Sequence, residues 1–364
     1  MMDLSEVKIS PKKLKAIVAD PEKSAKAVNL VYVHDKQPGI TRQKAGDKFV
    51  YFVGKKKLSN KNTLERIKKL AIPPAWENVW ICKFDNGHLQ ATGLDSRQRK
   101  QYRYHNLWNS LRNHTKFYRL YEFGQMVPTI RAQLQKDLAK RGLPVEKVLA
   151  TVVCLMEQTS IRIGNNAYEK LYGSYGITTL KDQHLKISGG NIQFVFTGKK
   201  GISHNIKINS KKLARIVKQC RDIPGKELFQ YYDQDGNHRA IDSGMVNQYL
   251  KSITGQDFTA KDIRTWLGTV KAISAFSEIN IAETQRAAKK NVIGVIDQVA
   301  TYLGNTRAVC KKYYVHPIII DLYERCELHN YYTKLNHVKK SSKYSLLSRE
   351  EKLLLHILEQ EKLI

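Results

Sequence analysis

The apolar residues of this chain change their spacing near residue 107, and this change limits what each part can fold into. Before it, residues 28–105 contain short runs rich in Val, Tyr, Trp and Phe, with turn residues such as Asn86-Gly87 between them. We therefore predict strands in this part, and one helix near Asn62–Leu70 that ends before the two prolines that follow it. The predicted strands are Leu30–His34, Lys48–Val53, Val79–Phe84 and Leu89–Thr92.

After residue 107 the spacing is that of helices. Val127–Lys140 and Val145–Ser160 repeat apolar residues at three- and four-residue steps. A β-hairpin is predicted from Ile192–Phe196 and Ile202–Ile208, and helical segments follow it to about residue 325. The last segment has a capping box, Ser348 with Glu351, before an apolar run. The predicted fold class is α+β, with a small β-rich N-terminal domain and a larger, mostly α-helical domain that carries a small sheet.

These changes of pattern divide the chain into four expected regions. A chain of 364 residues is long enough for two domains. The boundary between them falls near residues 105–120. The four regions are an N-terminal extension (1–27), a β-rich domain (28–110), a helical domain (111–336), and a linker with a C-terminal helix (337–364).

The charge of the chain points to its partner. Lys and Arg number 62 against 33 Asp and Glu, which gives a net charge of +29, and the basic residues run along the whole chain. A folded chain this basic repels itself unless a polyanion neutralises it, and nucleic acid is the natural polyanion. The hydrophobic fraction of 42% is enough to build cores, so global disorder is not expected.

Cysteine usage and the N-terminal segment indicate an intracellular protein. The five cysteines are widely spaced and form no CxxC pair, so neither a disulfide framework nor a zinc knuckle is indicated. The first ten residues are polar, and no stretch approaches about 20 apolar residues. We expect no signal peptide, no membrane-spanning helix and, for a bacterial chain, a cytoplasmic, nucleoid-associated location.

Several short motifs imitate cofactor sites but lack a required residue. Asp233, Asp235 and Asn237 begin like a calcium loop, but His238 stands where that loop needs glycine. None of the three Gly-Lys pairs has the Ser or Thr, or the earlier Gly, of a P-loop. We expect a polar turn at the first of these places, and neither a metal nor a nucleotide cofactor.

Four short segments combine basic, amide and hydroxyl side chains in a way that suits a phosphate. Taken singly, each has an ordinary explanation, because an Arg near a helix end is most often a surface residue and most tyrosines are packing residues. Their combination and order are more informative. The segments are Ser160–Asn165 with Arg162, the hairpin turn with Lys199, Lys261–Trp266 with Arg264, and Leu303–Thr306 followed by Lys311–Pro317.

The order Arg, hairpin Lys, Arg, Asn, Tyr resembles the active-site series of type IB DNA topoisomerases, in the poxvirus-like branch found also in bacteria. The strings that carry the resemblance are R-I-G-N, T-G-K-K-G-I-S-H, K-D-I-R-T-W and L-G-N-T, followed by Y-Y-V-H-P. The segment Ala91–Tyr104 is similar to the DNA-contacting signature of that branch. The resemblance covers roughly residues 28–325.

The resemblance implies an enzyme that relaxes positive and negative supercoils. A tyrosine cuts one strand of duplex DNA, forms a 3′-phosphotyrosine, and the strand swivels before it is rejoined. The phosphotyrosine conserves the bond energy, so no ATP is required, and fixed cations replace a metal. The resemblance also implies a monomer whose two domains form a clamp around double-stranded DNA.

The resemblance assigns a role to each candidate catalytic residue. Arg162 and Arg264 would hold the nonbridging phosphate oxygens, because guanidinium groups bind them in a bidentate manner and stay charged. Lys199, directly after Gly198, would protonate the leaving 5′-hydroxyl, although Lys200 is its neighbour.

Asn305 and Tyr314 complete the series. Many relatives carry His at the position of Asn305, and an amide can still donate a hydrogen bond to the phosphate but does not titrate near neutral pH. Tyr314 is the expected nucleophile rather than Tyr313, because it lies nine residues after Asn305 and three before Pro317.

The same resemblance implies DNA contacts outside the chemistry. Basic and aromatic residues that alternate along a segment are suited to positioning phosphates. The implied DNA-contacting residues are Arg99, Gln101, Tyr102, Tyr104, Tyr168 and Lys261.

Two other classes of protein share part of this pattern. A tyrosine recombinase or integrase has the Arg–Lys–Arg–Tyr set, but usually carries His where this chain has Lys261, and its companion domain is helical. A non-catalytic DNA-binding protein fits the charge but does not need the complete catalytic set.

Overall fold

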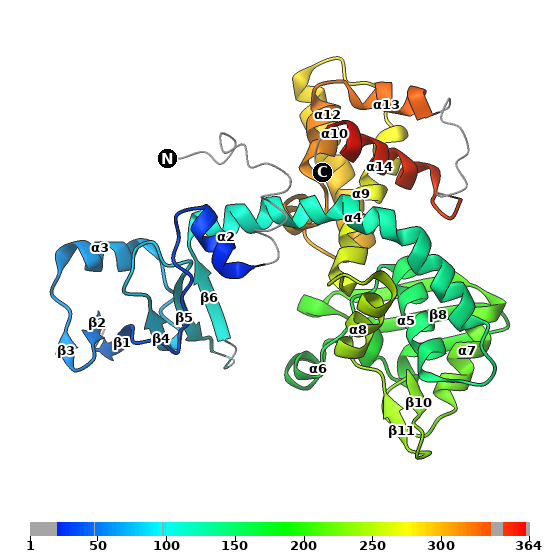
Figure 1. The fold of residues 1–364 in the computed structure, drawn as a ribbon, viewed down its shortest axis with the longest axis horizontal. Helices are drawn as coiled ribbons and strands as arrows, with labels where there is room; N and C mark the ends of the chain where they lie inside the picture. The colour runs from blue at the N-terminus through cyan, green and yellow to red at the C-terminus, as the bar shows by residue number, and fades with distance from the viewer. Residues whose placement is uncertain (1–19, 47, 97, 99, 336–344, 362–364) are drawn as a thin grey trace. The chain divides into compact units, whose positions relative to one another are not determined.

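A computed structural model describes residues 20–361 apart from 47, 97, 99 and 336–344. The chain divides into two compact units, Met1–Phe117 and Tyr118–Ile364 (Figure 1). The first unit contains a sheet and short helices, and the second is mostly helical with small sheets, so the predicted α+β class is confirmed.

The N-terminal unit is built on one antiparallel sheet of six strands in the order β3-β2-β1-β4-β5-β6. Helix α3 packs on this sheet, because Ile67 is buried in one cluster with Ile40, Val79 and Ile81 (Figure 1). The elements are α2 (Pro21–Ala27), β1 (Ile40–Ala45), β2 (Lys48–Val53), β3 (Lys56–Lys57), α3 (Lys61–Lys69), β4 (Glu77–Ile81), β5 (Leu89–Leu94) and β6 (Lys100–Tyr104).

The prediction of a strand over Leu30–His34 is wrong. Only Val31 makes a β-bridge, to Gly87, and the other residues of the segment belong to no strand. Leu30 and Val33 are buried in two different apolar clusters. Their apolar character therefore reflects packing of an irregular segment.

The strand β1 was not predicted, because Ile40–Ala45 is mostly polar. In the structure this strand is held by its pairing with β2 along its whole length.

The second unit contains most of the helices, and α4 begins in the first unit and ends in the second. A three-stranded antiparallel sheet, β7-β8-β9, contains the predicted hairpin and one further strand. The elements are α4 (Asn106–Leu138), α5 (Val145–Thr159), α6 (Asn166–Tyr172), η2 (Ile177–Thr179), η3 (Asp182–His184), β7 (Leu185–Ser188), β8 (Asn191–Thr197), η4 (Lys199–Gly201), β9 (Ser203–Asn209), α7 (Lys211–Arg221), β10 (Gln230–Tyr232), β11 (His238–Ala240), α8 (Ser243–Thr254), α9 (Ala260–Ser277), α10 (Gln285–Leu303), α11 (Arg307–Tyr313), α12 (Pro317–Glu324), α13 (Leu328–Leu335) and α14 (Arg349–Gln360).

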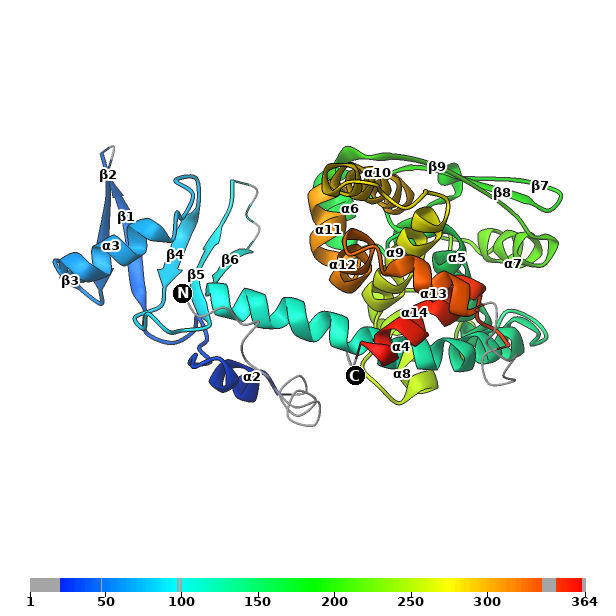
Figure 2. The same ribbon diagram turned by 90° about the horizontal axis from the view of Figure 1, so that it is seen from above.

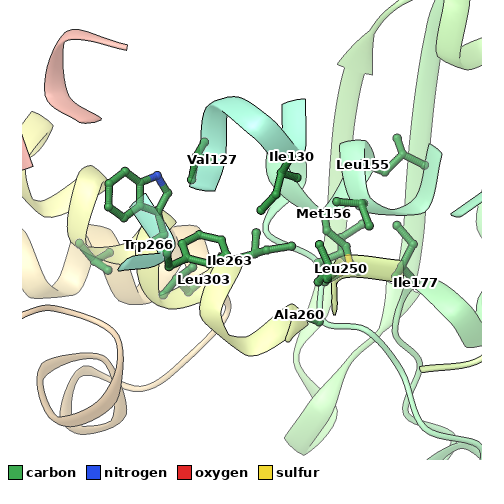
Figure 3. Close-up of a cluster of buried hydrophobic side chains, with 14 of the residues drawn as sticks. Val127, Ile130, Leu155, Met156, Ile177, Leu250, Ala260, Ile263, Trp266 and Leu303 are labelled. Carbon is green, nitrogen blue, oxygen red and sulfur yellow. The ribbon is translucent and has the colours of Figure 1, made fainter. Parts of the chain in front are cut away.

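Helix α9 occupies the middle of the second unit, where α5, α10, α12 and α14 contact it (Figure 2). Its N-terminus is fixed by a capping box, in which Thr259 and Asp262 satisfy each other's backbone N–H groups. Both α5 and α9 are buried on most of their surface. Figure 3 shows the resulting core, in which side chains from α4, α5, α8, α9 and α10 meet. Three polar residues of α9, Arg264, Thr265 and Thr269, are therefore buried inside the unit.

The polar turn predicted at residues 233–237 is confirmed. The Asp233 carboxylate accepts hydrogen bonds from the backbone N–H groups of Asp235 and Asn237, and its other oxygen pairs with Arg239. The turn joins the short strands β10 and β11. The carboxylate thus holds the turn by hydrogen bonds to its own backbone, as is typical of a polar turn.

The capping box predicted at Ser348 and Glu351 is confirmed at the start of α14. The apolar side of this helix lies in the core of the second unit, with Leu354 and Ile357 fully buried.

The predicted linker falls mostly on residues 336–344, outside the described residues. In the described part of the chain, no helix has the length and the apolar character that crossing a membrane requires.

Candidate active site

Arg264 lies on the second turn of α9 and is only 4% exposed. Its Nη1 donates to the backbone carbonyl of Ser160, and its Nη2 donates to that of Leu303 at 2.7 Å. Burial, and then the charge of Arg162, lower the pKa of Arg264 to about 10. The guanidinium therefore still carries its positive charge at neutral pH.

Arg162 comes from the irregular segment that follows α5. Its Nη2 donates to the carbonyl of Gly304 at 2.9 Å and to Oδ1 of Asn305. Burial lowers the pKa of Arg162 as well. The segment can turn here because Gly164 has a φ of +102° and Gly176 packs on its backbone, where a Cβ on Gly176 would lie 2.4 Å from the Gly164 nitrogen.

Asn305 follows the end of α10. Gly304 ends this helix in the left-handed conformation, with φ of +58°, and the Asn305 N–H donates to the carbonyl of Ala300. Because Oδ1 of Asn305 accepts from Arg162, its Nδ2 is left as a donor. This Nδ2 is buried and has no hydrogen-bond partner among the described residues.

Tyr314 directly follows α11 and lies against α9. Its backbone carbonyl accepts a hydrogen bond from Thr269, and a Cβ on Gly268 would lie 2.7 Å from that oxygen. Gly268 is one turn after Arg264, so both are on the same face of α9. The ring centroid of Tyr314 lies 5.4 Å from the Arg264 guanidinium carbon. The neighbouring Tyr313 has its ring near Lys312 instead, at 5.4 Å.

The buried Arg264, the half-buried Arg162 and Asn305 form a site suited to an anion with several oxygens. Among the described residues, Nε of Arg264 is a second buried donor without a hydrogen-bond partner. A buried donor left without an acceptor costs about 1–3 kcal/mol. A phosphate group placed beside Tyr314 would supply acceptor oxygens to these donors and compensate the positive charge.

Lys199 is an exposed residue of the turn η4, between β8 and β9. A hydrogen bond from the Gly198 N–H to the carbonyl of Ile202, at 2.7 Å, closes the turn. The Nζ of Lys199 lies 5.9 Å from the centroid of the Tyr168 ring. Arg162 donates to Asn305, whereas no hydrogen bond within the described part of the chain joins Lys199 to either residue. The structure thus brings four of the five candidate catalytic residues together, and the fifth, Lys199, lies on an exposed turn. The four are Arg162, Arg264, Asn305 and Tyr314.

Sequence reasoning missed His204, which lies on β9 directly opposite Phe196 and stacks on its ring. It lines a pocket of about 450 Å³ together with Asn305 and Arg307. Burial, and then the charges of Arg162 and Arg264, lower the pKa of His204. The sequence contains one signal for this position. Side chains alternate between the two faces of β9, and His204 lies on the same face as the apolar Ile206 and Ile208.

The predicted DNA-contacting residues of the N-terminal unit fall on two faces of the edge strand β6. The rings of Tyr102 and Tyr104 are stacked, with centroids 5.9 Å apart, and Tyr102 is 48% exposed. Gln101 alternates to the other face, where it donates to Asp95. Arg99 lies outside the described residues.

The two candidates in the second unit are both accessible. Tyr168 is 42% exposed on α6, beside Lys199. Lys261 is exposed on the first turn of α9, three residues before Arg264.

Two family models match the chain. The catalytic core of eukaryotic DNA topoisomerase I matches residues 99–341. The N-terminal domain of bacterial DNA topoisomerase IB matches residues 48–95. Together they match a part of each unit.

Individual relatives agree with these models. DNA topoisomerase 1B of Acanthamoeba polyphaga mimivirus is 34% identical over 295 residues, which is 79% of this chain and 88% of the relative. DNA topoisomerase 1B of Vaccinia virus (strain Copenhagen) is 24% identical over 63% of this chain and 71% of its own length. The chain belongs to the type IB DNA topoisomerases.

Proposed function

We propose that this topoisomerase relaxes supercoiled DNA through a covalent 3′-phosphotyrosine. Tyr314 Oη attacks the phosphorus of a backbone phosphate and loses its proton, while the bond from phosphorus to O5′ breaks and O5′ gains a proton. The 5′ end then swivels around the intact strand. In the reverse step the 5′-hydroxyl attacks the phosphotyrosine, which restores the phosphodiester without ATP.

The observation that carries this proposal is the contact of the buried Arg264 guanidinium with the ring of the half-buried Tyr314. The attacked phosphate gains negative charge on its nonbridging oxygens as the new bond forms. Arg162, Arg264 and the Nδ2 of Asn305 act as donors to those oxygens, and they are already oriented by backbone carbonyls. Such fixed donors need little reorganisation during the reaction, so no metal is required in this scheme.

Lys199 is the proposed general acid for the leaving O5′. The support is its place at the tip of the β8–β9 hairpin, where a long, exposed side chain can enter a groove of bound DNA. Tyr168 and Lys261 in the same unit, and Gln101, Tyr102 and Tyr104 in the other, are proposed DNA contacts. The enclosure of the duplex by both units, the monomeric state and the four-region division stay predictions from the resemblance and the sequence pattern.

Plasmid relaxation in excess EDTA, without ATP, tests the function. Both negatively and positively supercoiled plasmid should relax, because swivelling is driven by torsion of either sign. The Arg264→Ala variant serves as the control for contaminating activity and should leave both substrates supercoiled. Relaxation of one sign only, or a strict need for ATP or a divalent metal, would contradict the proposal.

A further inference from the structure

The ring of His204 fills the space between two glycines that each precede a candidate catalytic residue. Gly198 precedes Lys199, and a Cβ built on it would lie 2.6 Å from Nε2 of His204. Gly304 precedes Asn305, and a Cβ built on it would lie 2.5 Å from Cε1 of the same ring. Contacts shorter than 3.0 Å are not tolerated, so neither position has room for a methyl group beside His204.

The ring is fixed from its other side by Phe196. The two rings are stacked, with centroids 4.8 Å apart and an angle of 17° between their planes. Since Phe196 is buried in the main core, this stacking connects His204 to the rigid part of the sheet. The ring position is therefore set by the core and not by the exposed turn.

The two glycines that His204 contacts belong to two different parts of the candidate site. The carbonyl of Gly304 accepts the hydrogen bond from Arg162, so this glycine belongs to the half that would bind the phosphate. Gly198 belongs to the turn that presents Lys199. The His204 ring thus packs against both Gly198, in the turn that carries Lys199, and Gly304, which binds Arg162.

The charges around His204 favour the neutral imidazole. Arg162 and Arg264 face it, and both lower its pKa in addition to burial. Asp297 of α10 and Arg307 of α11 line the same pocket but pair with each other at 2.6 Å. Lys199 is a further cation on its own hairpin. A neutral ring in this place acts through its shape rather than through a charge of its own.

We propose that His204 is a positioning residue that sets the place of Lys199 relative to the phosphate-binding half of the site. The proposal rests on the proposed role of Lys199 as the general acid. If it holds, removal of the imidazole impairs protonation of the leaving group while the attack by Tyr314 and the binding of DNA are preserved.

A modified scissile phosphate separates these steps. In a duplex that contains a mapped cleavage site, O5′ of the scissile phosphate is replaced by sulfur, which leaves as a thiolate and needs no proton because a thiol is a much stronger acid than an alcohol. Single-turnover cleavage is measured on this duplex and on the ordinary one, together with the affinity for the ordinary duplex.

We expect His204→Ala to slow cleavage of the ordinary duplex by about 10- to 100-fold, a part of the effect of a general acid. Cleavage of the sulfur duplex should be slowed less than about threefold, and DNA affinity should be unchanged. Lys199→Ala should show the same selectivity with a larger defect. His238→Ala, on the exposed strand β11, is the matched histidine control and should behave as the unmodified protein.

The outcomes distinguish the two proposals. If Lys199→Ala is equally slow on both duplexes, Lys199 is not the general acid, and the inference on His204 falls with that assignment. If Lys199→Ala is rescued by sulfur but His204→Ala is not, only the inference on His204 is overturned, and the histidine is a structural part of the whole site.

A second pair of variants tests the contact itself. Gly198 has φ of −93°, a conformation that alanine adopts, so Gly198→Ala introduces only the clash with the His204 ring. We expect Gly198→Ala to slow cleavage of the ordinary duplex, and to have a smaller effect in a chain that also carries His204→Ala, because the clash is gone. Strictly multiplicative effects of the two substitutions would overturn the proposal.

Discussion

At the scale of single residues, the two arginines of the site, Arg162 and Arg264, are held by the C-terminal ends of helices. Ser160 caps α5, while Leu303 and Gly304 end α10, and their carbonyls accept the hydrogen bonds of Arg264 and Arg162. The last carbonyls of a helix have no partner within the helix and carry partial negative charge. These carbonyls stabilise the two guanidinium charges, and no carboxylate among the described residues pairs with either group, so their charge remains available to a phosphate.

The identity of the nucleophile gives the first prediction. Tyr314→Phe should abolish both the covalent adduct with DNA and plasmid relaxation, because the attacking oxygen is removed. Tyr313→Phe is the matched control and should retain adduct formation, since its ring lies near Lys312 rather than Arg264. Adducts are measured by denaturing electrophoresis of labelled DNA. The reverse pattern would move the nucleophile to Tyr313.

Asn305 gives the second prediction. Asn305→Ala removes a buried donor, and loss of one donor to a developing oxyanion slows a reaction by about 10²–10³-fold. Asn305→Asp should be slower still, because the carboxylate can accept from Arg162 but repels the phosphate. The single-turnover cleavage rate is the measurement. A rate for Asn305→Ala within about twofold of the unmodified enzyme would exclude a role for the amide in the transition state.

At the scale of elements, one buried carboxylate connects α14 to the helix that carries Arg264. Arg131 of α4 donates to both oxygens of Glu351 at 2.8 Å, and also pairs with Glu157 of α5. Trp266 of α9 donates its indole N–H to Glu351 at 2.9 Å. Trp266 lies two residues after Arg264. The C-terminal helix is therefore part of the framework that fixes α9.

Removal of this carboxylate should destabilise the second unit. Glu351→Ala leaves the buried Trp266 N–H without its acceptor, and Arg131 keeps only Glu157 as a carboxylate partner. A buried donor left without an acceptor costs about 1–3 kcal/mol. Glu359→Ala, at an exposed position of the same helix, should change the free energy of unfolding by less than about 0.5 kcal/mol. Urea denaturation measures both. Equal stability of the two variants would show that the pair contributes nothing.

The same pair gives a pH dependence with a defined sign. Burial by itself raises the pKa of Glu351, but the hydrogen bonds and charge of Arg131 outweigh it, so the pKa lies below its ordinary value. Such a group stabilises the folded state above the ordinary glutamate pKa, about 4.3, and this contribution is lost as the pH falls through the lower, folded-state pKa.

The stability difference between the unmodified chain and Glu351→Gln should therefore be constant from neutral pH to about pH 5, and shrink below about pH 4.3. Denaturant titrations at a series of pH values provide the measurement. A difference that grows on acidification would contradict the lowered pKa.

At the scale of the whole molecule, the charge of +29 makes DNA binding strongly dependent on salt. Each phosphate that a basic side chain neutralises contributes about −0.9 to the slope of log K against log salt concentration. We expect a slope of about −5 or steeper for duplex DNA, measured by fluorescence anisotropy between 50 and 300 mM salt. Lys261→Ala should make the slope less steep by about 1 if Lys261 contacts a phosphate. A slope near zero would exclude electrostatic binding.

The sequence alone determined what depends on local pattern and on residue chemistry. The spacing of apolar residues predicted the α+β class, the strand Lys48–Val53 and the capped helix that begins after Ser348. The order of short motifs predicted the family, which the comparisons confirmed. The same local reasoning failed at Leu30–His34, since an apolar segment that packs without strand pairing has no distinct sequence pattern.

The tertiary structure decided which of these residues meet. Arg162, Arg264 and Asn305 lie far apart in the chain, and they come together only because α5, α9 and α10 pack around one core. The contact of the Tyr314 ring with Arg264 and the place of His204 between two glycines depend on the same packing. A sequence shows how apolar residues are spaced along each helix or strand, and which chemical group each side chain carries. Contacts between distant segments follow from how whole elements fill space against one another, and no local pattern encodes them.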